Sequence, residues 1–129
     1  MQMKSFDTAA GYLPDECFKN PPDLGILLGS GWGEALKIDE VLVRIKYADI
    51  PGLGASTVKG HSGEFILYRP AGKLIAAWCG RRHYYEGAGW EPVVLPVEIL
   101  RRMGCQTLLL TNASGGINPA LRPGDFVII

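Results

Sequence analysis

The chain has 129 residues, about the size of one domain, and 47% of them are hydrophobic, which predicts a folded core rather than a disordered chain. Thirteen basic residues balance thirteen acidic ones, and this excludes the broad positive surface of a general nucleic-acid binder. No apolar run approaches the roughly 18 residues that cross a bilayer, so we expect neither a nucleic-acid nor a membrane partner.

The three cysteines, Cys17, Cys79 and Cys105, are widely spaced and include no C-x-x-C pair. An odd number at such spacing argues against a disulfide framework and a zinc site, and it suits a reducing compartment. The first residues also lack the basic stretch and long apolar run of a secretory signal. We therefore expect a cytoplasmic protein in which Cys79 is buried.

The first 63 residues predict one helix and two strands. The helix covers residues 5–18 and is interrupted near Pro14, because proline lacks the N–H that a helix interior needs. A short apolar run at 24–28 is bounded by breakers, which predicts a strand buried on both faces. Residues 41–47 alternate apolar and polar side chains, which predicts a strand with one wetter face, and residues 52–63 form a glycine-bearing loop.

The middle of the chain predicts a hairpin followed by a helix. Residues 64–69 and 73–79 are strand-like and are separated by a Pro-Ala-Gly turn, which makes them the clearest hairpin in the sequence. Apolar side chains recur at helical spacing over residues 90–103, where Pro96 should bend the helix or shift its start.

The last part of the chain predicts two more strands. Residues 107–110 form an apolar run that we expect to be buried, and residues 126–129 begin a further strand. Four apolar residues at the last positions would leave an unpaired strand, so we expect a chain cut short. Together these elements predict an α/β fold with a mixed, largely buried central sheet flanked by helices.

Two of the predicted strands end in glycine turns that carry polar side chains. Ser30 lies in the turn after residues 24–28, and Asn112 lies in the turn after residues 107–110. Open α/β sheets bind ligands beyond the carboxyl ends of their strands, and glycines let backbone N–H groups approach an anion. Neither turn matches the dinucleotide fingerprint or a P-loop. The alternative is a pair of tight turns in which Asn112 satisfies its own backbone.

Residues 81–87, with the sequence Arg-Arg-His-Tyr-Tyr-Glu-Gly, combine anion-binding and ring-stacking side chains. Arginine offers a planar fork of N–H donors for phosphate or carboxylate, histidine can donate from its ring, and tyrosine presents a flat face. The alternative is a solvated basic loop with its rings packed beside it. We expect Arg82 to point away from Arg81, toward solvent or a subunit surface.

Two other kinds of site are not supported by the sequence. His61 and His83 lie far apart and lack a carboxylate at ligand spacing, which argues against a metal site. Ser30 lacks the G-x-S-x-G frame of a hydrolase nucleophile, so no such triad is predicted.

Five motifs, taken together and in order, resemble the trimeric purine nucleoside phosphorylases. They are Gly29-Ser30-Gly31, Gly60-His61-Ser62-Gly63, Gly80-Arg81-Arg82-His83-Tyr84-Tyr85-Glu86-Gly87, Thr111-Asn112-Ala113-Ser114-Gly115-Gly116-Ile117-Asn118-Pro119 and Gly124-Asp125. The resemblance implies a pentosyltransferase of purine salvage, which cleaves purine ribonucleosides or deoxyribonucleosides with inorganic phosphate to a free base and a pentose 1-phosphate. It implies no metal and no organic cofactor, because phosphate is the co-substrate.

The resemblance also implies roles for individual residues. The phosphate ligands that it implies are Ser30, His61, Arg81, His83 and the backbone of Ala113. It implies that Tyr85 meets the sugar and that Asn112 and Ala113 lie near phosphate and nucleoside. It further implies that Glu86 holds the arginine–histidine loop by pairing with it.

The resemblance further implies a homotrimer in which residues 1–129 are the amino-terminal part of a single phosphorylase domain. The side chains that read the purine base in this family belong to a later half, which is absent from this sequence. Two alternatives stay open. One is a non-catalytic truncated fragment that acts as an interaction or phosphate-binding module, and the other is a related methylthioadenosine phosphorylase.

Overall fold

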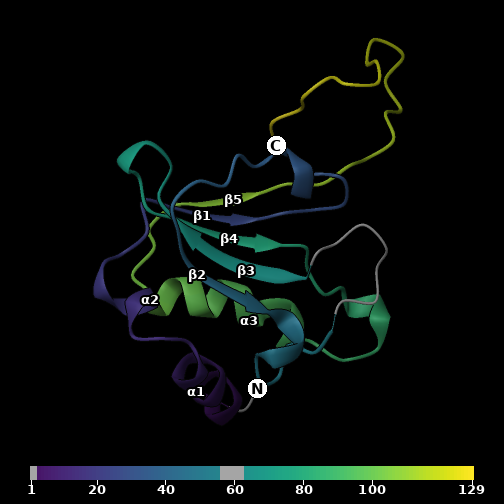
Figure 1. Cartoon of the computed structure of the whole chain (residues 1–129). Coiled ribbons are helices and arrows are strands. Elements are labelled where there is room, and N and C mark those ends of the chain that lie inside the picture. The colour runs from purple at the N-terminus through teal and green to yellow at the C-terminus, as the bar shows by residue number, and fades with distance from the viewer. Residues whose placement is uncertain (1–2, 56–62) are drawn as a thin grey trace.

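The computed structural model describes residues 3–55 and 63–129 (Figure 1). Its helices are α1 (Met3–Tyr12), α2 (Glu16–Lys19) and α3 (Glu91–Arg102). Its strands are β1 (Leu24–Leu27), β2 (Val41–Lys46), β3 (Glu64–Tyr68), β4 (Ile75–Cys79) and β5 (Leu108–Leu110). Short 3-10 turns cover Gly33–Ala35, Tyr47–Asp49, Pro70–Gly72 and Tyr84–Glu86.

The five strands form one mixed sheet in the order β2-β3-β4-β1-β5, as predicted for the fold class. Strand β3 pairs antiparallel with β2 and β4, which confirms the predicted hairpin, whereas β1 runs parallel to both β4 and β5. Because β1, β4 and β5 run in the same direction, their carboxyl ends meet at one end of the sheet. The loops that follow these strands are thereby brought together.

Both faces of the sheet carry a hydrophobic cluster. Helices α1 and α3 lie on one side of the sheet (Figure 1), where Trp78 and Phe65 are completely buried in one cluster with Ile99 of α3. On the other face Ile66 is buried, and Trp32 from the segment after β1 packs against its cluster. Each such buried side chain stabilises the fold by about 1.5–3 kcal/mol relative to leaving it exposed. The prediction of a largely buried sheet is therefore confirmed for β1, β3 and β4.

The two helical prolines have different effects. Helix α1 ends at Tyr12, before Pro14, because the residue that precedes a proline disfavours the helical conformation. Helix α3 instead continues through Pro96 as one helix. Pro96 has no N–H to donate to the carbonyl four residues earlier, and that carbonyl belongs to Pro92 in the first turn of α3. After α3, Gly104 adopts a left-handed φ of 80°, a conformation that commonly ends a helix.

The last part of the chain differs from the prediction in two ways. Strand β5 is an edge strand, and its three leucines, Leu108, Leu109 and Leu110, are 37%, 47% and 60% exposed rather than buried. The predicted strand at 126–129 does not form, and residues 112–129 loop away from the sheet as an irregular segment (Figure 1). A strand needs partners for its backbone N–H and C=O groups, and no strand of the described chain pairs with 126–129.

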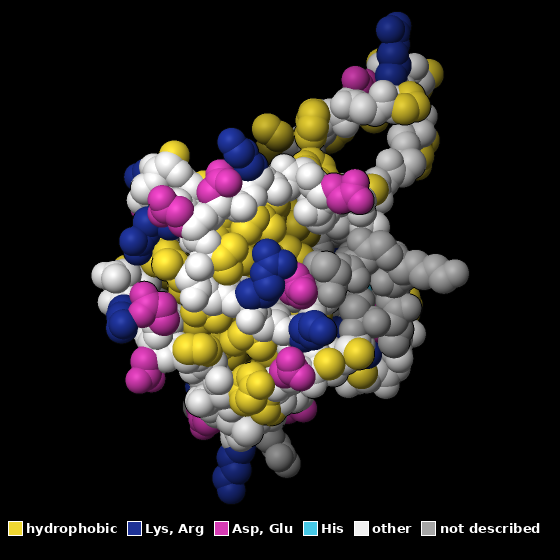
Figure 2. All heavy atoms as spheres, in the orientation of Figure 1, with side chains coloured by type: hydrophobic (Ala, Val, Ile, Leu, Met, Phe, Trp, Pro, Cys, Tyr) yellow, Lys and Arg dark blue, Asp and Glu magenta, His cyan; other side chains and the backbone are white. Residues whose placement is uncertain are grey.

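The surface carries both signs of charge. Figure 2 shows Lys and Arg side chains intermingled with Asp and Glu over one face, with hydrophobic side chains between them. This agrees with the equal numbers of basic and acidic residues. Among the described helices, none combines the length and the apolar character that a membrane span requires.

Candidate functional site

Three loops with polar side chains begin at the carboxyl ends of the parallel strands. Ser30 follows β1, Arg81 follows β4 and Asn112 follows β5. Leu27, the last residue of β1, lies opposite residues at or next to the ends of both neighbouring strands. The loops therefore start at the same level of the sheet, at the end where open α/β sheets bind ligands.

Thr111 joins these loops, although sequence reasoning gave it no role. Its backbone N–H donates to the Leu27 carbonyl at 3.1 Å, and its Oγ1 accepts the Gly29 N–H at 3.0 Å. Its carbonyl accepts a hydrogen bond of 2.6 Å from Arg81 Nη1, which uses one of the five N–H donors of a guanidinium. Thr111 is only 8% exposed. A polar residue directly after an apolar run was the signal that could have identified this junction.

Gly29 permits the close approach of the loops after β1 and β5. A Cβ at this position would lie 2.5 Å from the Thr111 carbonyl oxygen and 2.8 Å from Asn112 Cα, which is closer than side chains come to backbone atoms. Trp32 Nε1 adds a hydrogen bond of 3.3 Å to the Asn112 carbonyl. Ser30, between Gly29 and Trp32, is exposed. The turn that contains Ser30 is therefore held by the packing of Gly29 and by the Trp32 hydrogen bond, and Ser30 itself is exposed.

The two arginines of the loop after β4 bind different partners, although both line the hollow between α3 and the ends of β1 and β5. Arg81 reaches toward β5, whereas Arg82 points inward and is 9% exposed. Arg82 Nη1 donates to the carbonyls of Leu53 at 3.1 Å and Ala55 at 2.8 Å. The expectation that Arg82 faces solvent or a subunit surface is therefore wrong. These distant carbonyls accept its N–H groups, and such bonds offset the cost of burying a charged group.

Glu86 links two residues of the same loop. Its Oε1 accepts the backbone N–H of His83 at 2.6 Å, and its Oε2 lies 2.9 Å from Arg82 Nε. The His83 ring in turn accepts the backbone N–H of Glu86, which completes a reciprocal capping box. The Glu86 side chain is 5% exposed, so this carboxylate lies between two partners and away from water.

Aromatic rings lie on the outer side of this loop. Tyr85 is 76% exposed, and its ring stacks on His83 with centroids 4.9 Å apart and an interplanar angle of 20°. Tyr84 stacks on Trp90 at 4.5 Å and 27°, and both rings are more than half exposed. The loop therefore presents flat faces beside an imidazole, an arrangement suited to contact with a sugar ring.

A hollow of about 660 Å³ lies between α3 and the ends of β1 and β5. Arg81 and Asn112 line it, and side chains of α3 such as Val93 and Val97 form an apolar wall. The Asn112 amide oxygen accepts a hydrogen bond of 2.6 Å from the Ser114 hydroxyl, so this side chain is oriented within its own turn. The hollow thus combines the guanidinium groups of Arg81, Arg82 and Arg101, the Glu98 carboxylate and one amide with hydrophobic surface.

The other predicted site residues lie elsewhere. Ser30, His83 and Tyr85 are not among the described residues that line the hollow, and Ala113 is exposed in the irregular segment that follows β5. His61 lies outside the described residues. Within residues 3–55 and 63–129, no group of three or more His, Cys, Asp and Glu side chains could hold a metal ion.

Comparison with known proteins identifies the family. Residues 23–129 match the phosphorylase superfamily. The chain is 43% identical to purine nucleoside phosphorylase 1 of Bacillus subtilis (strain 168) over 108 residues, which are 84% of this chain and 40% of that protein. It is 37% identical to purine nucleoside phosphorylase 1 of Geobacillus stearothermophilus over 129 residues, which are 100% of this chain and 47% of that protein.

Comparison with solved structures shows that relatives share the fold of this chain. Isoform 2 of purine nucleoside phosphorylase from Schistosoma mansoni, in complex with cytosine and ribose-1-phosphate, matches with a TM-score of 0.79 and 38% identity. The match covers 96% of this chain and 43% of that one. The chain belongs to the purine nucleoside phosphorylase family. It spans about half the length of these relatives, and the resemblance drawn from the five motifs is confirmed.

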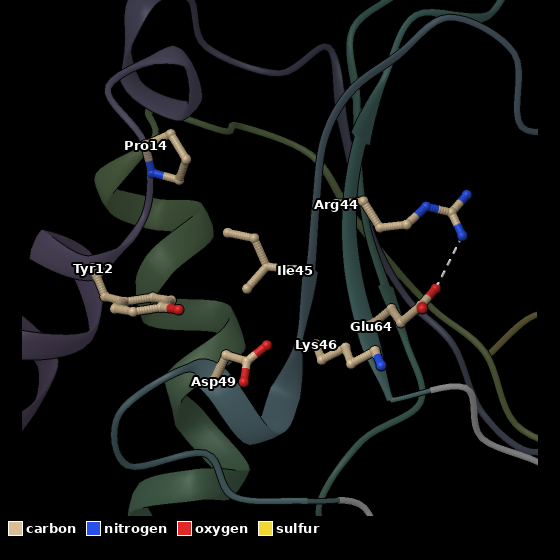
Figure 3. A pocket seen from close by; sticks show the side chains of 7 residues that line it. All are labelled: Tyr12, Pro14, Arg44, Ile45, Lys46, Asp49 and Glu64. Carbon is tan, nitrogen blue, oxygen red and sulfur yellow. Dashed lines mark hydrogen bonds and ion pairs between the residues drawn. The ribbon is translucent and has the colours of Figure 1, made fainter.

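A second hollow, of about 540 Å³, lies at the opposite edge of this phosphorylase sheet (Figure 3). It is lined by Tyr12, Pro14, Arg44, Ile45, Lys46, Asp49 and Glu64. Figure 3 shows Ile45 pointing toward Tyr12, while Arg44 lies on the other side of β2 with its Nη1 3.2 Å from Glu64 Oε2. Both cationic and anionic side chains line this hollow, and none of the predicted site residues within the described chain is among them.

Proposed function

We propose that this chain carries the phosphate-binding side of a purine nucleoside phosphorylase, which transfers the pentose of a purine nucleoside to inorganic phosphate. The observation that supports this most directly is the junction at Thr111, where the loops after β1, β4 and β5 are cross-linked. Membership of the family supplies the reaction class. The relative from Schistosoma mansoni was solved with ribose-1-phosphate, a pentose 1-phosphate of the expected product class.

In this proposal, donors from separate loops hold the phosphate. Arg81 is the principal ligand, because charge-assisted hydrogen bonds are roughly twice as strong as neutral ones. The other proposed phosphate ligands are Ser30, His61, His83 and the backbone N–H of Ala113. Tyr85 is proposed to contact the sugar, and Asn112 the nucleoside. Glu86 supports the loop through its contacts with Arg82 and His83.

The bound phosphate is both nucleophile and counter-charge. One phosphate oxygen forms a bond to the anomeric carbon while the glycosidic C–N bond breaks, and the electron pair of that bond leaves with the purine. Positive charge develops on the sugar, so an anion held beneath it by fixed donors stabilises the transition state. Holding the two reactants in position lowers the barrier by roughly 7–11 kcal/mol in well-oriented systems. A homotrimer without metal or organic cofactor belongs to the same proposal and is supported by the family alone. The proposed cytoplasmic location is supported by the odd number and wide spacing of the cysteines.

A second candidate is a non-catalytic phosphate-binding fragment. The three exposed leucines of β5 favour it, because they leave apolar surface at and beside the hollow uncovered within the described chain. The two candidates share phosphate binding and differ only in whether the chain cleaves a nucleoside.

Two measurements on the purified chain test these candidates. A titration with inorganic phosphate, followed by phosphorus NMR, should show saturable binding under either candidate. Incubation with inosine, with and without phosphate, should release the free base only when phosphate is present if the chain is catalytic. Phosphate binding without base release supports the fragment, and the absence of phosphate binding contradicts both candidates for this chain.

A further inference from the structure

The segment that follows β2 is attached to the loop after β4 at two places. The Tyr47 hydroxyl donates to the Gly80 carbonyl at 2.6 Å, directly before Arg81. Farther along the segment, the Leu53 and Ala55 carbonyls accept hydrogen bonds from Arg82. The segment is itself anchored, since Tyr47 and Leu53 are each 1% exposed. One face of the arginine–histidine loop therefore rests on a buried support.

The backbone of the support is shaped to admit the guanidinium. Gly54 lies between the two acceptor carbonyls with a φ of 70°, a left-handed conformation that favours glycine. A Cβ at Gly54 would lie 3.1 Å from Arg82 Nη1, which is tighter than ordinary van der Waals contact. A larger residue here would press on the position that Arg82 occupies.

Arg82 also contacts Glu86, which in turn binds the backbone of the same loop. Its Nε lies 2.9 Å from Glu86 Oε2, and the other oxygen of Glu86 accepts the His83 backbone N–H at 2.6 Å. Contacts therefore run without a break from residues 53 and 55 through Arg82 and Glu86 to the backbone of His83. Arg81, the preceding residue, bonds instead to the Thr111 carbonyl, and both arginines line the same hollow.

We infer that Arg82 is a positioning residue, which fixes Arg81 and His83 for phosphate by joining the backbone at residues 53–55 to Glu86. The inference rests on the proposed function, since it assigns Arg82 to the support of the same phosphate site. Arg82 does not touch phosphate in this account. It sets the geometry of the residues on either side of it.

The test compares Arg82→Met, Arg82→Lys and Arg44→Met in the full chain. Arg44→Met is the matched control, because Arg44 pairs with Glu64 on the surface. Two quantities are measured, the affinity for inorganic phosphate and the rate of hydrogen exchange at individual backbone amides. Arg82→Met should weaken phosphate binding about tenfold and speed exchange of the His83 amide about tenfold, because it leaves the buried Glu86 carboxylate without its cation. Amides of β3 and β4 should keep their rates.

Arg82→Lys keeps the charge but lacks the planar fork, so it should recover phosphate affinity to within about threefold of the unmodified chain. Arg44→Met should change neither quantity. Wild-type phosphate affinity in both Arg82 variants would overturn the inference, as would an equal rise in exchange across the whole sheet, which indicates general destabilisation. If Arg82→Met does not fold, Arg82→Gln takes its place, because it also removes the charge, and unchanged phosphate affinity together with unchanged His83 exchange in that variant contradicts positioning. If the unmodified chain binds no phosphate, the proposed function fails, while His83 exchange still reports whether Arg82 holds the loop.

Discussion

Strands β4 and β5 flank β1 on its two sides, yet their ends are supported differently. All of β4 is buried, and Tyr47, Arg82 and Glu86 hold the loop after it from within. The leucines of β5 are exposed, and the turn after β5 is held through Thr111 and Asn112. The comparison indicates that the loop after β4 is held in place by buried contacts within the described chain, whereas the turn after β5 has less support among the described residues.

The largest expected effect is the difference in stability between a truncation in β4 and a truncation in β5. Trp78 in β4 is 0% exposed and packs on Phe65 with ring centroids 4.7 Å apart, so Trp78→Ala should cost about 3–5 kcal/mol of the free energy of unfolding. Leu109 in β5 is 47% exposed, so Leu109→Ala should cost about 1 kcal/mol or less. Urea denaturation of both variants measures the difference. Equal losses would mean that β5 is as well packed as β4.

The next effect concerns Arg81, the proposed phosphate ligand, which follows β4 and bonds to the Thr111 carbonyl after β5. Arg81→Ala should weaken phosphate binding by about 1.5–3 kcal/mol, the usual contribution of a hydrogen bond to a charged group. This corresponds to roughly 10- to 150-fold in the dissociation constant. Arg101→Ala is the matched control, because Arg101 lines the same hollow but pairs with Glu98. Phosphate titration of both variants separates them, and equal affinities would remove Arg81 from the site.

A smaller effect is expected at the junction itself. Thr111→Val keeps the shape of the side chain but removes the oxygen that accepts the Gly29 N–H, so a buried donor loses its partner. The expected cost is about 1–3 kcal/mol of the free energy of unfolding. Thr107→Val provides the control directly before β5, since Thr107 is exposed and its backbone carbonyl accepts the Gly25 N–H. If thermal denaturation gives the same stability for both variants, Thr111 does not cross-link the loops.

The comparison of β4 with β5 also shows where sequence reasoning succeeds. Short apolar runs bounded by glycine and proline predicted the strands at 24–28, 64–69 and 73–79 within one or two residues. Polar turns were also predicted directly after two of the strands, and the parallel pairing of β1 with β4 and β5 brings the turns after these strands to one end of the sheet. These features are local, or they follow from local features by simple topology.

Other features depend on partners far away in the sequence, and for that reason they were missed. Residues 107–110 are as apolar as a buried strand, but exposure depends on what lies beside the strand and not on its composition. Arg82 is buried because carbonyls 29 and 27 residues away accept its N–H groups. The role of Thr111 requires an N–H that lies 82 residues away. Such pairs follow from the packed structure and not from a sequence window.

The smallest expected effect is the pH dependence of stability that comes from Tyr47, whose hydroxyl bonds to the backbone just before the loop after β4. Burial, and to a lesser extent the nearby Cys79 and Glu64, raises the pKa of the Tyr47 phenol above its ordinary value of 10.0. The folded chain therefore keeps this proton at pH values where the unfolded chain releases it. The resulting stability is fully present below about pH 10 and is lost as the pH rises above that value.

Tyr47→Phe removes both this titration and the hydrogen bond of 2.6 Å to the Gly80 carbonyl. We expect a loss of about 0.5–1.5 kcal/mol at neutral pH and a shallower decline of stability above pH 10 than in the unmodified chain. Urea denaturation at several pH values measures both, with Tyr12→Phe as the control because Tyr12 is 49% exposed. The buried Cys17, whose pKa burial raises to about 11, is present in every variant, so the difference isolates Tyr47. If the alkaline declines coincide, the support beneath Arg81 does not depend on the Tyr47 proton, and the contrast with β5 must come from Arg82 and Glu86 alone.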